Sequence, residues 1–318
     1  MKKLLVTAFI AVCILFSSCS YFEIDLPSYD VSDTASGESR EPVIKTVYLL
    51  KRETTYSQYM VVESYTEYEY DEQHREIKRT VYDRTGKRTS AVWTEYDING
   101  RVTSVTYYDA DGLTDYVVDS RYNEDGVLVS EYTYNPDGAI TNLLLYTYDE
   151  LGRKTDTVYS NASGAVLYSV VNTYNSDGTY VSNLDVVSGI KRRAECDANG
   201  NILIQTDYDS DGNLNYKTTY VYDESKTNRV SAVTEYADGS WTDFEYFYNE
   251  DGAIDYIEYR SMSELVSSIY TYEYDEHGNL VYEGASNAAE VPMSAITREY
   301  IAVETEVIIE DEAETESE

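Results

Sequence analysis

Residues 134–138 read Tyr-Asn-Pro-Asp-Gly, and this five-residue motif recurs along the middle of the chain. Pro136 presets the backbone of the first central residue of a type I turn, and Gly138 takes the left-handed conformation that closes the turn. Asn135 can bond its side chain to the backbone two residues on. Each copy of the motif therefore predicts a tight reversal between two antiparallel strands.

The copies share a tyrosine, then Asp or Asn, two variable residues and a glycine. From Gly86 to Gly178 the glycines follow one another in alternating steps of 14 and 12 residues, so the repeat is 26 residues long and holds two half-units. Degenerate copies end at Gly164, Gly189, Gly200 and Gly239. The residues expected to shape the turns are Asp97, Gly100, Asp109, Gly112, Asn123, Gly126, Asn135, Gly138, Asp149, Gly152, Asn175, Gly178, Asp209 and Gly212.

The segments between the turns have the composition of strands. Residues 101–108 and 127–134 are rich in β-branched and aromatic types. We expect an all-β fold, an antiparallel β-hairpin repeat meander of about 16 strands over residues 43–300, forming an elongated or curled sheet. The motif tyrosines share the more apolar face of this sheet, and their hydroxyls still reach water.

The two ends of the chain differ from its middle. Residues 1–18 carry Lys2 and Lys3 and then an apolar stretch too short to span a membrane, which is typical of a signal peptide. Residues 19–42 lack strand alternation and predict a flexible tether. Residues 301–318 predict an acidic, disordered tail.

Residues 16–19, Phe-Ser-Ser-Cys, resemble the end of a bacterial lipoprotein signal. The resemblance implies cleavage before Cys19, acylation of that residue and anchoring to a membrane through more than one acyl chain. Ser20 then favours the outer membrane or the cell surface. An ordinary secretory signal, with Cys19 incidental, is the alternative.

Charge and composition exclude several classes of function. With 59 acidic and 24 basic residues, the formal net charge is −35, which argues against nucleic-acid binding. Only 2 histidines are present, at 74 and 277, so histidine-dependent metal sites and triads are not expected. Cys196 stands in a slot that tyrosine fills elsewhere and is interpreted as a packing residue, with no intrachain disulfide. We expect no cofactor, no metal and no enzymatic activity.

Several features leave alternatives open. The Asp-x-Asp-Gly turns suggest weak calcium binding, but a four-residue turn offers too few oxygens, and turn formation is the favoured interpretation. The run 191–193, Lys-Arg-Arg, is either a solvated strand edge or a spot for an anion. Aromatic side chains on a solvated sheet either pack across strands or stack on sugar rings, and the candidates for stacking are Trp93, Trp241, Phe244, Tyr246 and Phe247.

Tyr148–Thr155 (YDELGRKT) and Tyr96–Thr103 (YDINGRVT) resemble the RHS/YD repeat, and 208–214 and 274–280 resemble its Gly-Asn-Leu variant. The resemblance covers roughly residues 65–285 and implies a continuous sheet of β-hairpins. The MORN-variant repeat is a second resemblance, seen at Tyr107–Gly112. The chain shows no toxin domain, so toxin delivery is not expected. We expect a lipid-anchored envelope protein that binds or scaffolds a protein partner, with glycan binding as the alternative and an immunity-type role less favoured.

Overall fold

The computed structural model describes residues 43–262 and 265–307. The predicted signal peptide, Cys19, the tether up to residue 42 and the acidic tail from residue 308 lie outside the described residues. Leu49–Ile301 forms one compact unit, and residues 43–48 and 302–307 group with the chain ends in another.

The described chain is all-β with 20 strands, and each strand from β1 to β19 pairs antiparallel with the next one along the sequence. Most strands are seven to nine residues long. The bounds are β1 Val43–Tyr56, β2 Val62–Tyr70, β3 Glu76–Asp83, β4 Arg88–Tyr96, β5 Val102–Tyr108, β6 Thr114–Tyr122, β7 Leu128–Tyr134, β8 Ile140–Tyr148, β9 Lys154–Asn161, β10 Val166–Tyr174, β11 Tyr180–Val186, β12 Lys191–Cys196, β13 Ile202–Tyr208, β14 Leu214–Tyr222, β15 Arg229–Tyr236, β16 Trp241–Tyr248, β17 Ile254–Ser261, β18 Val266–Tyr274, β19 Leu280–Asn287 and β20 Pro292–Val307.

The expectation of about 16 strands is wrong, because five turns carry no glycine signal. Across the described residues, fourteen turn glycines have φ between +76° and +94°. Five further turns place a residue other than glycine in the same left-handed region, with φ between +52° and +63°. L-residues rarely adopt this conformation, so a sequence pattern based on glycine misses those turns. The five residues are Met60, His74, Lys226, Met262 and Glu290.

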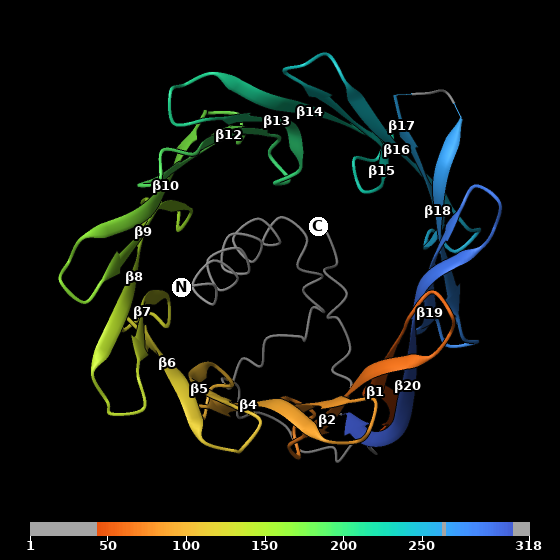
Figure 1. The fold of residues 1–318 in the computed structure, drawn as a ribbon. Coiled ribbons are helices and arrows are strands. Elements are labelled where there is room, and N and C mark those ends of the chain that lie inside the picture. The colour runs from red at the N-terminus through yellow and green to blue at the C-terminus, as the bar shows by residue number, and fades with distance from the viewer. Residues whose placement is uncertain (1–42, 263–264, 308–318) are drawn as a thin grey trace, which may run out of the picture. The chain divides into compact units, whose positions relative to one another are not determined.

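The sheet closes on itself, a question that the sequence left open between an elongated and a curled form. Besides its pairing with β2, strand β1 pairs with β20, so the described sheet has no unpaired edge strand (Figure 1). Arg298 of β20 donates from Nε to Glu53 of β1 at 3.0 Å, across 245 residues of sequence, and from Nη2 to Glu283 of β19 at 3.2 Å. Closure removes the two edges at which an open meander would be prone to associate.

The turns lie on two rims of the barrel, because strand direction alternates. Rim A holds the turns that follow even-numbered strands, from β2–β3 to β18–β19, and rim B holds those that follow odd-numbered strands, from β1–β2 to β19–β20. Leu49 and Ile301 both lie toward rim A, since Leu50 accepts a bond from Tyr70 and Tyr300 bonds Leu280. The chain therefore enters and leaves the compact unit at rim A.

The barrel has little central core. Among the described residues, no large side chain is fully buried, and the one buried apolar cluster consists of Ala194, Cys196 and Ile202 with Tyr180 and Tyr220 packed against it. A closed sheet of this many strands is too wide for its inward side chains to fill. Stability therefore comes from strand pairing and from cross-strand ring contacts such as Tyr107–Tyr116, whose centroids are 4.2 Å apart.

Candidate binding surfaces

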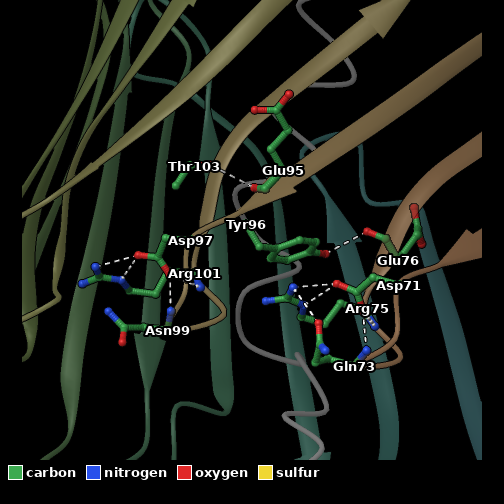
Figure 2. Close-up of polar contacts among 10 residues, drawn as sticks. All are labelled: Asp71, Gln73, Arg75, Glu76, Glu95, Tyr96, Asp97, Asn99, Arg101 and Thr103. Atoms are coloured by element: carbon green, nitrogen blue, oxygen red, sulfur yellow. Dashed lines mark hydrogen bonds and ion pairs between the residues drawn. The ribbon is translucent and has the colours of Figure 1, made fainter.

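The motif aspartates and asparagines shape the turns. Asp97 Oδ1 accepts the backbone N–H groups of Asn99 and Arg101, both at 2.9 Å, and Oδ2 accepts from the Arg101 guanidinium (Figure 2). These bonds hold the pKa of the Asp97 carboxyl below its usual range, the bond from the Arg101 backbone most of all. Side chains at 109, 123, 135, 149 and 209 accept backbone bonds in the same way. In the turn that begins at Asn175, the Thr179 backbone N–H donates to Asp177 Oδ1 at 3.0 Å instead of to Asn175.

The motif tyrosines of rim A connect neighbouring turns. Tyr96 donates its hydroxyl to the carbonyl of Glu76 at 2.8 Å, and the Arg75 guanidinium lies 4.5 Å from the centre of the Tyr96 ring (Figure 2). The same hydroxyl-to-carbonyl bond recurs from tyrosines 70, 122, 148, 174, 222, 248, 274 and 300. Cys196 fills the corresponding slot at the end of β12, where it is buried. The repeat tyrosines thus connect neighbouring turns at rim A through their hydroxyl groups.

Charged side chains occupy both faces of the sheet in the middle of strands. The expectation that the motif tyrosines share one face is wrong, because those at the ends of odd-numbered strands, such as Tyr108 and Tyr208, lie on the face opposite the tyrosines of rim A. On the face of the rim A tyrosines, Arg192 pairs with Asp207 at 2.7 Å. On the opposite face, Arg260 contacts Asp243 at 3.1 Å and Glu245 at 2.9 Å, and also Glu258. Both faces of the sheet therefore carry paired charged side chains in the middle of strands.

A second polar cluster lies between β7 and β9, on the face of the rim A tyrosines. Tyr146 donates its hydroxyl to Glu131, and the Lys154 ammonium lies 4.4 Å from the centre of the Tyr146 ring. Burial lowers the pKa of Lys154, although the charge of Glu131 opposes this effect. Burial also raises the pKa of Tyr146, so the phenol stays protonated at neutral pH. The three side chains of this cluster therefore interact with one another.

Trp93 is the most open of the aromatic residues proposed to stack on a ligand. Its exposed fraction is 48%, and it lies on the face opposite the tyrosines of rim A. The Tyr108 ring lies 5.3 Å away at 57°, and Lys78 Nζ lies 5.7 Å from the indole. Beneath the indole and phenol lie the small buried side chains of Ala91 and Thr80, paired across β3 and β4. The Trp93 indole is therefore open for stacking on a ligand, beside the ammonium group of Lys78.

The other stacking candidates are on β16 and are engaged in cross-strand packing. Phe244 packs on Tyr259 with centroids 4.9 Å apart, and Phe247 stacks on Tyr256 at 4.3 Å. Tyr246 accepts a 3.4 Å bond from Arg229, and Trp241 is half-buried. Trp93 is on β4, so the fold does not bring these candidates together in one site.

The basic run 191–193 is not a strand edge. It lies in β12, which pairs with β11 on one side and β13 on the other. Each cation meets a carboxylate: Lys191 meets Asp185, Arg192 meets Asp207 and Arg193 meets Glu195. The interpretation as a solvated edge is therefore wrong, because the irregular spacing around 179–199 conceals regular strand pairing.

The described residues contain no group of three or more metal-ligating side chains placed to hold an ion. They also contain no helix with the length and apolarity to cross a membrane.

Comparisons with known proteins found structural similarities at low sequence identity. No family model matches the chain, and no curated protein matches it. A porin-like protein from Bacteroides uniformis is similar over 79% of this chain and 96% of its own, with 9% identity and a TM-score of 0.37. A porin-like protein from Bacteroides vulgatus is similar over 80% and 99%, with 12% identity and a TM-score of 0.34.

A further similarity is to the Tc holotoxin pore of Photorhabdus luminescens, with 13% identity and a TM-score of 0.19. It covers 76% of this chain but 19% of the toxin chain. These TM-scores are too low to indicate a shared fold, so the function has to be inferred from the geometry of this chain.

Proposed function

We propose that this chain is a non-catalytic, lipid-anchored protein of the bacterial cell envelope, built from YD-type hairpin repeats, whose barrel presents a rigid surface to a protein partner. One observation carries the proposal. The closed sheet has charged and aromatic side chains in the middle of strands on both faces, each held by defined partners. A surface of this kind is preordered, so a partner that binds it incurs little entropic cost for ordering it.

Anchoring follows from the predicted lipidation of Cys19. The chain enters the compact unit at rim A, and residues 20–42 form the predicted tether. Twenty-three extended residues reach about 75 Å. The barrel body would therefore sit within that distance of the membrane that holds the anchor, with the outer membrane or cell surface as the proposed location.

Protease treatment of intact cells tests the location. The full chain carries an epitope tag, and Cys19→Ala is the control for anchoring. Cleavage on whole cells, with release of the Cys19→Ala chain, supports a surface location. A Cys19→Ala chain that fractionates with membranes as the wild type does would contradict lipid anchoring.

Capture from an envelope extract tests partner binding. The tagged full chain is the bait, and Arg260→Met, which leaves three carboxylates on one face without their shared cation, is compared with Arg192→Met on the other face. We expect one of the two variants to lose the captured protein while the other retains it, because a partner occupies one face. Recovery of no protein above background by the wild-type chain would refute the proposed role.

Glycan binding is a second candidate, and the exposed ring of Trp93 favours it. Aromatic platforms beside a charged group suit the apolar face of a sugar ring. Retention on an insoluble glycan panel is compared for wild type, Trp93→Ala and Trp241→Ala. Loss confined to Trp93→Ala supports a site on β4. Equal retention of all three chains, or no retention of the wild type, would exclude it.

A further inference from the structure

Arg229 occupies a position that five other repeats fill with an apolar side chain. It lies at the start of β15, opposite Tyr222 at the end of β14. The residues at the equivalent position of those five repeats are Val102, Leu128, Ile202, Ile254 and Leu280. The β14–β15 turn is also one residue longer than the motif turn, because the Asp223 N–H donates to the carbonyl five residues on instead of four.

The longer turn separates Arg229 from the aspartate of its own turn. In the β4–β5 turn, Arg101 directly follows the turn glycine and pairs with Asp97 at 2.6 Å. In the β14–β15 turn, Asn228 holds the equivalent position and Arg229 comes one residue later. The half-buried arginines 192, 260 and 298 each contact at least one carboxylate. Arg229 is half-buried too, but it forms no ion pair with any carboxylate of the described residues.

The guanidinium of Arg229 lies among three tyrosine rings. Its central carbon is 4.7 Å from the centre of the Tyr220 ring, 5.8 Å from that of Tyr222 and 5.7 Å from that of Tyr246. Nη1 donates to the Tyr246 hydroxyl at 3.4 Å, whereas Nε is buried and has no hydrogen-bond partner in the described part of the chain. Aromatic rings offset only part of the cost of burying a cation. The cation is therefore held in place without a counter-ion.

The face of the sheet around Arg229 carries no other charge on β14, β15 and β16. The side chains that share this face are Tyr216, Thr218, Tyr220, Tyr222, Ala232, Thr234, Tyr236, Thr242, Phe244, Tyr246 and Tyr248. The acidic residues of β15 and β16, which are Glu235, Asp243 and Glu245, lie on the opposite face. An anion that reaches Arg229 over these three strands thus meets aromatic, small and hydroxyl side chains only.

Acidic residues farther out restrict the charge of a ligand. On β13, Asp207 shares this face and pairs with Arg192 at 2.7 Å. The rim A turns that follow β14 and β16 carry Asp223, Glu224, Glu250 and Asp251. These groups and the net charge of −35 would repel a polyanion. A single carboxylate on an uncharged body would gain the cation and meet much less repulsion.

We propose that Arg229 and the rings of Tyr220, Tyr222 and Tyr246 form a binding site for one carboxylate group carried on an apolar or aromatic body. The carboxylate supplies the missing counter-ion and accepts charge-assisted hydrogen bonds from the guanidinium. The body packs on the neighbouring rings, including that of Phe244 on the same face. A sugar body fits less well, because this face of β14–β16 offers no Asn, Gln, Asp or Glu side chain to its hydroxyl groups.

Ligand-detected NMR of the full chain in detergent tests the site. The probes are 3-(4-fluorophenyl)propionate and its amide, which share one body while only the acid carries a charge. We expect the wild-type chain to bind the acid at least about tenfold more tightly than the amide. Equal binding of acid and amide, or binding of neither, would overturn the proposal. Because small molecules are the probes, this result is separate from the capture of a protein partner or retention on a glycan.

Two variants assign the preference for the acid to Arg229. Arg229→Leu introduces the residue type of Leu128 and Leu280, so we expect it to remove the preference while the thermal midpoint stays the same or rises. Lys154→Met is the matched control, since Lys154 holds the equivalent position in β9 and rests on a tyrosine ring but has the charge of Glu131 nearby. A preference that persists in Arg229→Leu, or that Lys154→Met loses to the same extent, would contradict the assignment.

Arg229→Lys keeps the assay decisive if Arg229→Leu does not fold. It retains the positive charge without the planar fork of donors, so part of the preference for the acid should remain. Complete loss of the preference in Arg229→Lys, at the thermal midpoint of the wild type, would show that the charge at this position does not bind the probe.

Two further probes identify the source of the carboxylate. N-acetyl-4-fluorophenylalanine represents the end of a peptide chain, and galacturonate represents a sugar acid. Tighter binding of the peptide probe than of the propionate supports the site with a chain end as its ligand, and weaker binding supports it with a free monocarboxylate. Galacturonate that binds more tightly than both would assign the site to a sugar acid and overturn the choice of an apolar body.

Discussion

Arg298 closes the barrel, and its replacement by methionine would loosen the closure locally. The guanidinium of β20 donates to Glu53 of β1 at 3.0 Å and to Glu283 of β19 at 3.2 Å. Its side chain is 15% exposed, against 27% and 34% for the two carboxylates. Methionine keeps most of the packing volume while it removes the charge, so the change reports on the two ionic hydrogen bonds.

The size of the effect follows from the partial burial of the three groups. A hydrogen bond to a charged group contributes about 1.5–3 kcal/mol when buried, and much less when solvent reaches it. Two such bonds at this exposure amount to about 2 kcal/mol in all. Because a tenfold change corresponds to about 1.4 kcal/mol, local opening of the β1–β20 pair should become roughly 30 times more frequent.

Amide hydrogen exchange measures this opening. In Arg298→Met, protection should fall about 30-fold in 49–56 and 293–301 and stay unchanged in β9–β11, which lie far from the closure. Arg260→Met is the control, since Arg260 also joins carboxylates across strands but lies in β17, and its effect should fall on β16–β18. Unchanged protection at β1 and β20 in Arg298→Met, or an equal loss there in Arg260→Met, would refute the role given to this residue.

Three further outcomes are expected. Gly138→Ala should lower the unfolding free energy by about 1–2 kcal/mol, the strain of a left-handed alanine, since its Cβ meets no neighbour. Gly189→Ala should lower it distinctly more, because the new Cβ would overlap Ser210, whose Cα would be 2.8 Å away. Equal losses of unfolding free energy in the two variants, measured by chemical denaturation, would contradict the steric argument. Tyr96→Phe should lower the unfolding free energy by about 0.5–1.5 kcal/mol through loss of the bond to the Glu76 carbonyl, and an unaltered denaturation midpoint would show that water replaces the bond at no cost. Burial raises the pKa of Tyr70 to about 12. The neutral phenol therefore stabilises the fold fully below pH 10, and this stabilisation is lost as the pH rises from 10 toward 12. Tyr70→Phe should flatten the dependence of the unfolding free energy on pH between 10 and 12, and an unchanged dependence there would rule Tyr70 out as its cause.

The turn chemistry could be predicted from the sequence because it is local. An Asp or Asn that caps its own turn, and a glycine three residues later, act within five residues, so the pattern at Asp97–Gly100 already specifies the reversal that the structure shows. The same reasoning failed where the left-handed position holds Met60, Met262 or Glu290, since no local preference favours those residues there. The YDEQH stretch that ends at His74 and the YDESK stretch that ends at Lys226 both retain the Tyr-Asp pair, so these two missed turns carried a readable signal.

The surfaces were harder to predict, because exposure depends on which strands become neighbours. Trp93 and Trp241 look alike in the sequence, but cross-strand partners leave the first open and the second half-buried. Met60, Met262 and Val291, exposed at three turns of rim B, are far apart along the chain, and only the pairing of β18 with β19 and of β20 with β1 makes their turns adjacent.

The sequence by itself determined the all-β class, the antiparallel hairpins and the acidic character, because each depends on residues close together in the chain or on composition alone. It also predicts a lipid anchor at Cys19. Only the tertiary structure decided that the sheet closes, that it has 20 strands, and that Glu53 meets Arg298. A small constant twist between neighbouring strands accumulates over many hairpins. Whether the first and last strands then meet depends on the sum of all those steps, which no single repeat contains.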